Sequence, residues 1–286
     1  MKRPMRWQGA TTVALWVACL APPLAGWADV LITDVIGKPG LVSKPPLAIL
    51  NPIANGSVVD LPSGFQFSAI DLATGKEYLA SGPGRFSVSS NGVLSATTGT
   101  VKVRSVTNGA LPDVKIATDK LSRAAMTMRG DVTLLSKPPG YPAHSVIPDT
   151  APTLRWSRLA GASSYRVTVS DDANKPLWQR NTTEAQLALP PEAGLQPGNR
   201  YAWAVEPLNQ TGEPIANATR TTFSVVPSDV ARVLAAIKPE PNASFSSWVL
   251  YAAQLQQAGV TEDARAIWQA LAHERPNDPN LKKLMK

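Results

Sequence analysis

Short runs of alternating apolar and polar residues fill most of the chain before residue 228. In residues 29–110, several runs place an apolar residue at every second position. One face of each strand can then be buried while the other contacts water. Turn sequences separate the runs, and Asn-Gly at 55–56 and 91–92 is the strongest short hairpin signal. This pattern predicts a small β-barrel or β-sandwich, with strands at 30–32, 47–50, 57–61, 65–70, 77–80, 85–88 and 99–103 and a turn at Gly82-Pro83-Gly84.

A second alternating segment covers residues 132–227. Apolar side chains keep period two from Leu154 to Trp156 and again from Tyr165 to Val169. Roughly seven short strands over such a length are the number expected of an immunoglobulin-like β-sandwich. The strand-like runs stand at 152–156, 162–169, 176–178, 185–190, 195–205 and 222–225.

The period of the apolar positions changes from two to 3.6 in residues 228–286. Ser228 and Asp229 are expected to cap a first helix that ends near Ile237. A second helix is expected over 244–258, up to Gly259, and a third from Thr261 to a point before Pro276.

A connector of mixed composition, residues 111–131, lies between the two β-rich segments. Residues 117–129 within it predict a short helix, with Thr118 or Asp119 as N-cap and Gly130 after its end. The chain as a whole is therefore predicted to be a mainly β multidomain protein with a C-terminal helical segment.

Residues 29–110 resemble the FecR-type periplasmic domain. The resemblance rests on the Asn55-Gly56 turn, Asp60-Leu61, Ser63-Gly64, Gly75 with Tyr78, and Gly82-Pro83-Gly84 before Phe86. It implies a sensor or docking domain, since FecR-type domains pass a signal from an outer-membrane receptor through a membrane helix to a sigma factor. No second apolar span follows this segment, so a signal would have to pass through a partner protein.

Residues 132–227 resemble fibronectin type III domains. Leu195, Pro197, Gly198 and Tyr201 have the spacing of that family's tyrosine corner, in which the Tyr hydroxyl contacts backbone. The resemblance places Trp156 at the position of the core Trp and Tyr165 at that of a strand-C Tyr. We expect structural roles for these three aromatic residues and for Trp203, which is in step with Tyr201.

Residues 245–278 resemble one tetratricopeptide repeat. The matching positions are Trp248, Ala252, Gly259, Ala264, Trp268, Leu271 and Pro276, although Ala252 replaces a usual Gly and Leu271 a usual small residue. We expect structural roles for Trp248 and Trp268. A single repeat cannot bury both of its faces. The helices must therefore dock on the second β segment, on one another with residues 228–237 and 279–286 as caps, or on a partner.

Residues 1–28 have the three parts of a secretory signal peptide. Basic residues at 2, 3 and 6 precede an uncharged run at 10–20, and small residues precede a cleavage point after Ala28. This predicts a periplasmic or secreted bacterial protein without a membrane span in its mature part. The alternative is a lipoprotein lipidated at Cys19, the only cysteine.

Charge and composition exclude some functions. Without residues 1–28, 25 basic and 21 acidic residues remain, a net charge of +4 with no Lys/Arg cluster. Nucleic-acid binding is therefore not expected. His144 and His273 are the two histidines, and no Gly-x-Ser-x-Gly elbow is present. We expect no catalytic set, metal site or cofactor.

The sequence favours an exported, non-enzymatic cell-envelope protein that acts as an interaction, scaffold or sensor module. Its expected partner is an envelope protein, bound through the C-terminal helices or the FecR-like segment. The alternative is a peptidoglycan- or glycan-binding protein, with Trp178 as the candidate platform for a sugar ring. A secreted hydrolase with two carboxylates across a cleft is the third alternative.

Overall fold

Three packed regions make up residues 30–37, 47–89, 92–106 and 140–284, which the computed structural model describes. We call residues 30–106 the N-terminal β domain, residues 140–226 the sandwich, and residues 228–284 the helical block. The prediction of a mainly β chain with a C-terminal helical segment is confirmed. The expected signal peptide and connector helix lie outside the described residues.

One antiparallel sheet forms the N-terminal β domain. Its strand order is β2-β1-β4-β5-β3, and β6 pairs with β5. Its core contains alternate side chains of β1 and β4, which pack with Tyr78, Phe86 and Leu94. The strands are β1 (Val30–Ile36), β2 (Pro52–Ile53), β3 (Val58–Leu61), β4 (Gln66–Asp71), β5 (Lys76–Val88) and β6 (Leu94–Ser105).

The turn predicted at Gly82-Pro83-Gly84 is wrong, because these residues lie inside β5. Here β5 exchanges one antiparallel neighbour for another, pairing with β4 before this point and with β3 after it. A side chain at Gly82 would overlap the carbonyl oxygen of Pro62, and one at Gly84 would lie 2.5 Å from that of Thr98. The glycines are needed for close backbone approach rather than for a turn.

The strand predicted at residues 47–50 is also wrong. These residues form a turn beside β1, in which the Leu50 amide donates to the Ile32 carbonyl at 2.8 Å. Their side chains are nevertheless buried or half-buried, so the apolar run indicates burial rather than a strand.

Two sheets that share one core form the sandwich. The larger sheet has the order β11-β10-β13-β14-β8 and the smaller one β12-β9-β7. The strands are β7 (Gly140–Tyr141), β8 (Ser145–Ile147), β9 (Thr153–Trp156), β10 (Ser164–Asp171), β11 (Pro176–Thr182), β12 (Gln186–Ala188), β13 (Arg200–Leu208) and β14 (Thr219–Val225), with a short 3₁₀ helix η1 (Pro191–Ala193).

The helical block consists of α2 (Ser228–Ile237), α3 (Phe245–Gln257), α4 (Thr261–Glu274) and α5 (Pro279–Leu284). Ser244 caps α3, accepting a hydrogen bond from the Ser247 amide at 3.1 Å. The side-chain cap expected at Ser228 is wrong, because α2 follows Pro227 and no side chain caps it. Gly259 adopts φ of +80° between α3 and α4, where a side chain would be strained.

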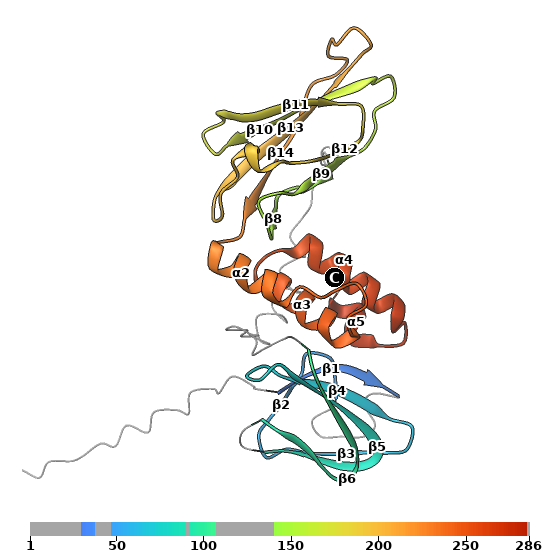
Figure 1. Cartoon of the computed structure of the whole chain (residues 1–286). Helices are drawn as coiled ribbons and strands as arrows, with labels where there is room; N and C mark the ends of the chain where they lie inside the picture. Colours follow the sequence, from blue (N-terminus) through green and yellow to red (C-terminus); the bar gives the residue numbers. More distant parts are fainter. Residues whose placement is uncertain (1–29, 38–46, 90–91, 107–139, 285–286) are drawn as a thin grey trace, which may run out of the picture.

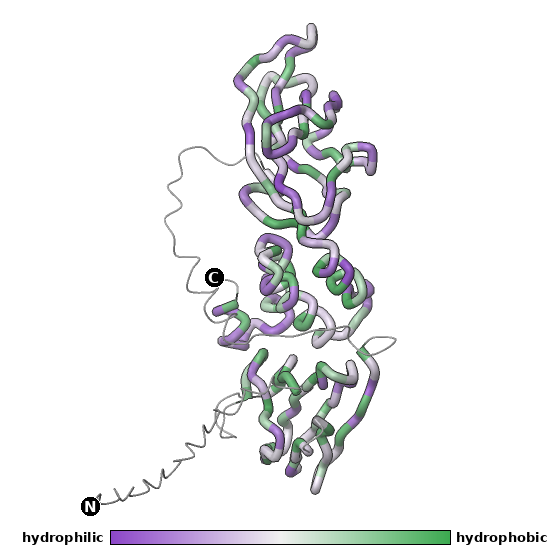
Figure 2. Tube along the Cα trace, turned by 90° about the vertical axis from the view of Figure 1, so that its left-hand side faces the viewer, coloured by the Kyte–Doolittle hydropathy of each residue, from purple (hydrophilic) through white to green (hydrophobic). Residues whose placement is uncertain are grey.

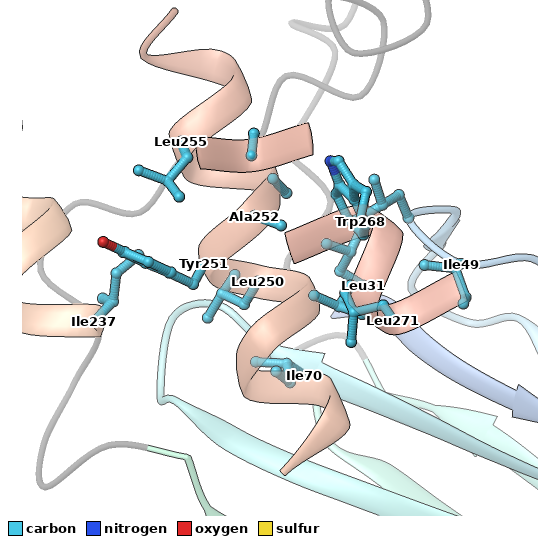
Figure 3. Close-up of a cluster of buried hydrophobic side chains, with 14 of the residues drawn as sticks. Leu31, Ile49, Ile70, Ile237, Leu250, Tyr251, Ala252, Leu255, Trp268 and Leu271 are labelled. Carbon is cyan, nitrogen blue, oxygen red and sulfur yellow. The ribbon is translucent and has the colours of Figure 1, made fainter. Parts of the chain in front are cut away.

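The helical block lies between the two β regions, although it comes last in the chain (Figure 1). A second view shows the same order, with the helices between the sandwich and the N-terminal β domain (Figure 2). Figure 3 shows one cluster in which Leu31, Ile49 and Ile70 of the N-terminal β domain pack with Leu250, Trp268 and Leu271 of the helices. The N-terminal β domain is a docking surface that the sequence had not indicated.

Strand β1 supplies both cores because successive side chains point to opposite faces. Val30 and Ile32 belong to the core of the N-terminal β domain, whereas Leu31 belongs to the cluster with the helices. Ile70 lies opposite Leu31 on β4 and joins the same cluster. A strand buried on both faces has a continuous apolar run, and Val30-Leu31-Ile32 is such a run.

Polar contacts accompany this apolar docking. The Thr33 hydroxyl donates to the Ser246 hydroxyl at 2.8 Å in a buried position. Arg275 donates from Nη2 to Asp34 Oδ2 at 2.9 Å, and its guanidinium lies 4.5 Å from the centre of the Phe245 ring. Asp34 is 5% exposed, and Arg275 is its ion-pair partner in this nearly buried position.

We expect Trp268→Ala to destabilise the protein by about 3–5 kcal/mol, the usual cost of removing a fully buried large side chain. Trp268 is 1% exposed, and its Nε1 donates to Gln256 Oε1 at 3.0 Å. Trp248→Ala is the matched control, since Trp248 is only half-buried on α3. Urea unfolding measures both. An equal loss of unfolding free energy in the two variants would contradict the packing described for Trp268.

Candidate functional site

The aromatic residues expected to be structural lie in the packed cores. Trp156, Tyr165, Tyr201 and Trp203 are between 1% and 8% exposed in the sandwich. The Tyr201 hydroxyl accepts a hydrogen bond from the Gln196 amide at 2.7 Å, across the turn that precedes β13. Trp203 Nε1 donates to the Pro142 carbonyl at 2.8 Å. Trp268 is buried in the cluster that joins the helices to the N-terminal β domain, and the half-buried Trp248 packs against that cluster.

Trp178, the candidate glycan platform, lies on β11 at the edge of the larger sheet. It is half-buried and packs against the sandwich core, while Leu177 beside it is 40% exposed. The indole is thus neither enclosed in the core nor fully open to solvent. Its role as a platform stays a prediction.

The two histidines lie apart, in different regions. His144 is in the loop between β7 and β8, where its Nδ1 is 3.4 Å from the Thr222 hydroxyl. His273 is exposed on the last turn of α4. Within residues 30–37, 47–89, 92–106 and 140–284, no three His, Cys, Asp or Glu residues are grouped so that they could hold a metal ion.

A cleft of about 520 Å³ lies between the sandwich and the helical block. We call it the interdomain cleft. The sandwich lines it with the ends of β7, β8 and β9 and the loop between β8 and β9, and the helical block with α3, α4 and the residue after α2. Its lining residues are Tyr141, Ile147, Pro148, Asp149, Ala151, Pro152, Thr153, Arg155, Lys238, Tyr251, Leu255, Glu262, Asp263, Ala266 and Ile267.

A hydrogen bond crosses one side of the interdomain cleft. The Tyr141 hydroxyl on β7 donates to Asp263 Oδ2 on α4 at 2.8 Å. Burial raises the pKa of Asp263, although this hydrogen bond opposes the shift by stabilising the carboxylate. Burial and the charge of Asp263 together raise the pKa of the Tyr141 phenol, so it stays a donor. The guanidinium of Arg155 lies 5.6 Å from the centre of the Tyr141 ring.

Another polar group of the interdomain cleft has no hydrogen-bond partner among the described residues: Glu262 Oε2 on α4 is buried without a donor. Buried polar groups are nearly always paired, so a hydrogen-bond donor in the cleft would satisfy this oxygen. Tyr251 on α3 also lines the cleft, and the residue is only 7% exposed. Figure 3 shows its hydroxyl pointing away from Leu250, toward the side of Ile237.

The sequence did not indicate the interdomain cleft. Tyr141 and Asp263 are 122 positions apart, and neither belongs to a motif. The one local signal was the 3.6-residue period of the helix, which places Tyr251 and Leu255 on the same face of α3. Tertiary docking of the helices against the sandwich creates the rest of the site.

Comparisons with known proteins do not assign the chain. No family model matches it, and no curated protein matches it. None of the helices among the described residues is long and apolar enough to cross a membrane.

Asp263→Asn is expected to raise stability more at pH 7 than at low pH. The folded-state pKa of Asp263 lies above its ordinary value of 3.8, so ionisation costs stability above that value. Asparagine keeps an acceptor for Tyr141 without the charge. The gain over the native protein should therefore shrink as the pH falls through the folded pKa toward 3.8. Urea unfolding across this range measures it, and a gain that grows toward low pH would contradict the raised pKa.

Proposed function

We propose that this chain is an exported, non-enzymatic cell-envelope protein that works as an interaction or sensor module and binds its ligand in the interdomain cleft. The observation that carries the proposal is the buried Glu262 Oε2, which has no partner among the described residues, in a cleft at the junction of two packed regions. Pockets of about 300–1,000 Å³ at domain interfaces are the usual place for a small ligand or a single side chain of a partner. Periplasmic or secreted localisation rests on residues 1–28 of the sequence.

The proposal includes the domain types indicated by the sequence. A FecR-like N-terminal β domain would supply the sensor or docking role. A fibronectin type III-like sandwich is supported by the Tyr201 hydroxyl bound to backbone at Gln196. A tetratricopeptide-like pair, α3 and α4, is supported by the turn at Gly259 and by the buried Trp268.

The position of the helices changes where a partner is expected to bind. In the sequence, the unpaired apolar faces of the helices were the main reason to expect a partner there. Leu31, Ile49 and Ile70 cover much of that apolar surface within the chain itself. Helix α3 is buried on nearly all sides, since residues 246–256 are buried except for the half-buried Trp248. The interdomain cleft therefore replaces the helix faces as the proposed binding site.

Ala266→Trp is expected to abolish ligand capture by filling the interdomain cleft. Ala266 is an exposed residue of α4 that lines the cleft, so a large side chain there blocks the cleft without entering a core. Ala270→Trp is the matched control, exposed one turn further along α4 and outside the lining. Immobilised native and variant proteins are incubated with envelope extract, and the retained species are quantified by mass spectrometry.

The expected result is a species held by the native protein and by Ala270→Trp, and reduced at least about tenfold for Ala266→Trp. Circular dichroism checks that both variants are folded. Capture that is unchanged in Ala266→Trp would contradict the proposed site. Sedimentation with cell-wall sacculi that depends on Trp178, and not on Ala266, would favour the glycan-binding alternative instead.

A further inference from the structure

We propose that the interdomain cleft binds a protonated primary amine on a short aliphatic chain, such as the side chain of a lysine residue or a free aliphatic diamine. This inference rests on the proposed function and specifies the chemistry of its ligand. It follows from the charges of the lining, from the unpartnered Glu262 Oε2 and from the apolar walls of the cleft.

Carboxylates outnumber cations in the lining and lie deeper. Glu262 and Asp263 are half-buried, whereas Arg155 and Lys238 are exposed at the rim. Arg155 is also engaged above the Tyr141 ring. Asp149 adds a third carboxylate, which is exposed as the two cations are. The interior therefore carries an excess of negative charge that a cation would neutralise.

The unpartnered carboxylate oxygen needs a ligand that donates hydrogen bonds. Glu262 Oε2 accepts only, and it has no donor among the described residues. An ammonium group has three donors and no acceptor, so it can bind Glu262 and still donate to the Tyr251 hydroxyl of the same lining. Hydrogen bonds between ionised groups are the strongest of those available to this site.

Apolar side chains separate the polar groups of the cleft. Ile147 and Pro152 of the sandwich and Leu255 of α3 are buried beside it, and Ile267 of α4 is half-buried. These surfaces suit a chain of methylene groups, which gains from burial in proportion to its area. A volume of about 520 Å³ accommodates a side chain or a small molecule but not a folded domain.

Pentylamine is the probe that tests the inference on the full mature chain, with pentanoate and pentan-1-ol as probes of equal chain length. Titrations are followed by the amide signals of α3 and α4 in NMR spectra. We expect saturable binding of pentylamine at least about tenfold tighter than that of the other two probes. Pentanoate binding equally well or better would overturn the inference.

Two near-isosteric variants identify the groups that bind the amine. Glu262→Gln is expected to weaken pentylamine binding by about tenfold, because it replaces the carboxylate acceptor with a neutral amide. Glu192→Gln, an exposed change on η1, should leave binding unchanged. Tyr251→Phe should also weaken it. Unchanged affinity in both Glu262→Gln and Tyr251→Phe would overturn the assignment.

The sign of the ligand charge has an independent test at the rim. Lys238→Met removes a like charge and should strengthen pentylamine binding, whereas it would weaken the binding of an anion. Weaker pentylamine binding in Lys238→Met would count against a cationic ligand.

Two further probes distinguish the sources of the amine. Tighter binding of N-acetyl-lysine-N-methylamide points to a lysine side chain in a peptide, and tighter binding of 1,5-diaminopentane to a free diamine. If no amine binds while Ala266→Trp still loses the envelope ligand, the amine inference fails and the proposed function stands. If Ala266→Trp keeps that ligand, the proposed function fails on its own measurement.

Discussion

The packing of α3 and α4 on the outer face of β1 and β4 is the interaction on which the rest of the structure depends. Leu31 and Ile70 turn away from the core of the N-terminal β domain and enter a cluster with Leu250 and Trp268. Without the helices these side chains would contact water, and so would much of α3. The first and last described parts of the chain therefore stabilise each other, and we expect them to fold as one cooperative unit.

The interdomain cleft is a consequence of this docking. Once one side of the helical block packs on the N-terminal β domain, the opposite side meets the sandwich through smaller contacts, such as the hydrogen bond from Tyr141 to Asp263. Val226 continues the apolar cluster at the point where the sandwich joins the helices. The remaining space is lined by residues that include Tyr251 and Glu262, and Glu262 Oε2 has no partner among the described residues. The packing of the helical block between two β regions thus positions these lining residues.

Local patterns predicted the elements better than their assembly. The 3.6-residue period located α3 and α4 to within a residue or two, because Ser244 caps α3 and Gly259 separates the two helices. The turn predicted at Gly82-Pro83-Gly84 was wrong because glycine also allows the close backbone approach found there. The run Val30-Leu31-Ile32 indicated a strand, but not that its second face is covered by residues more than 200 positions away. The cleft was not predictable, since its two sides meet only in the folded chain.

The pair formed by Thr33 and Ser246 offers the most direct test of the docking on which this arrangement depends. Their hydroxyl oxygens are 2.8 Å apart in a buried position, so cysteines at both sites should be within reach of a disulfide. The measurement is the yield of intramolecular disulfide in monomeric Thr33→Cys/Ser246→Cys protein with Cys19→Ser, read by mass spectrometry after mild oxidation. A high yield is predicted, with none for the control pair Thr33→Cys/Ser228→Cys. Free thiols throughout, or disulfides only between molecules, would contradict docking of the helices within the chain.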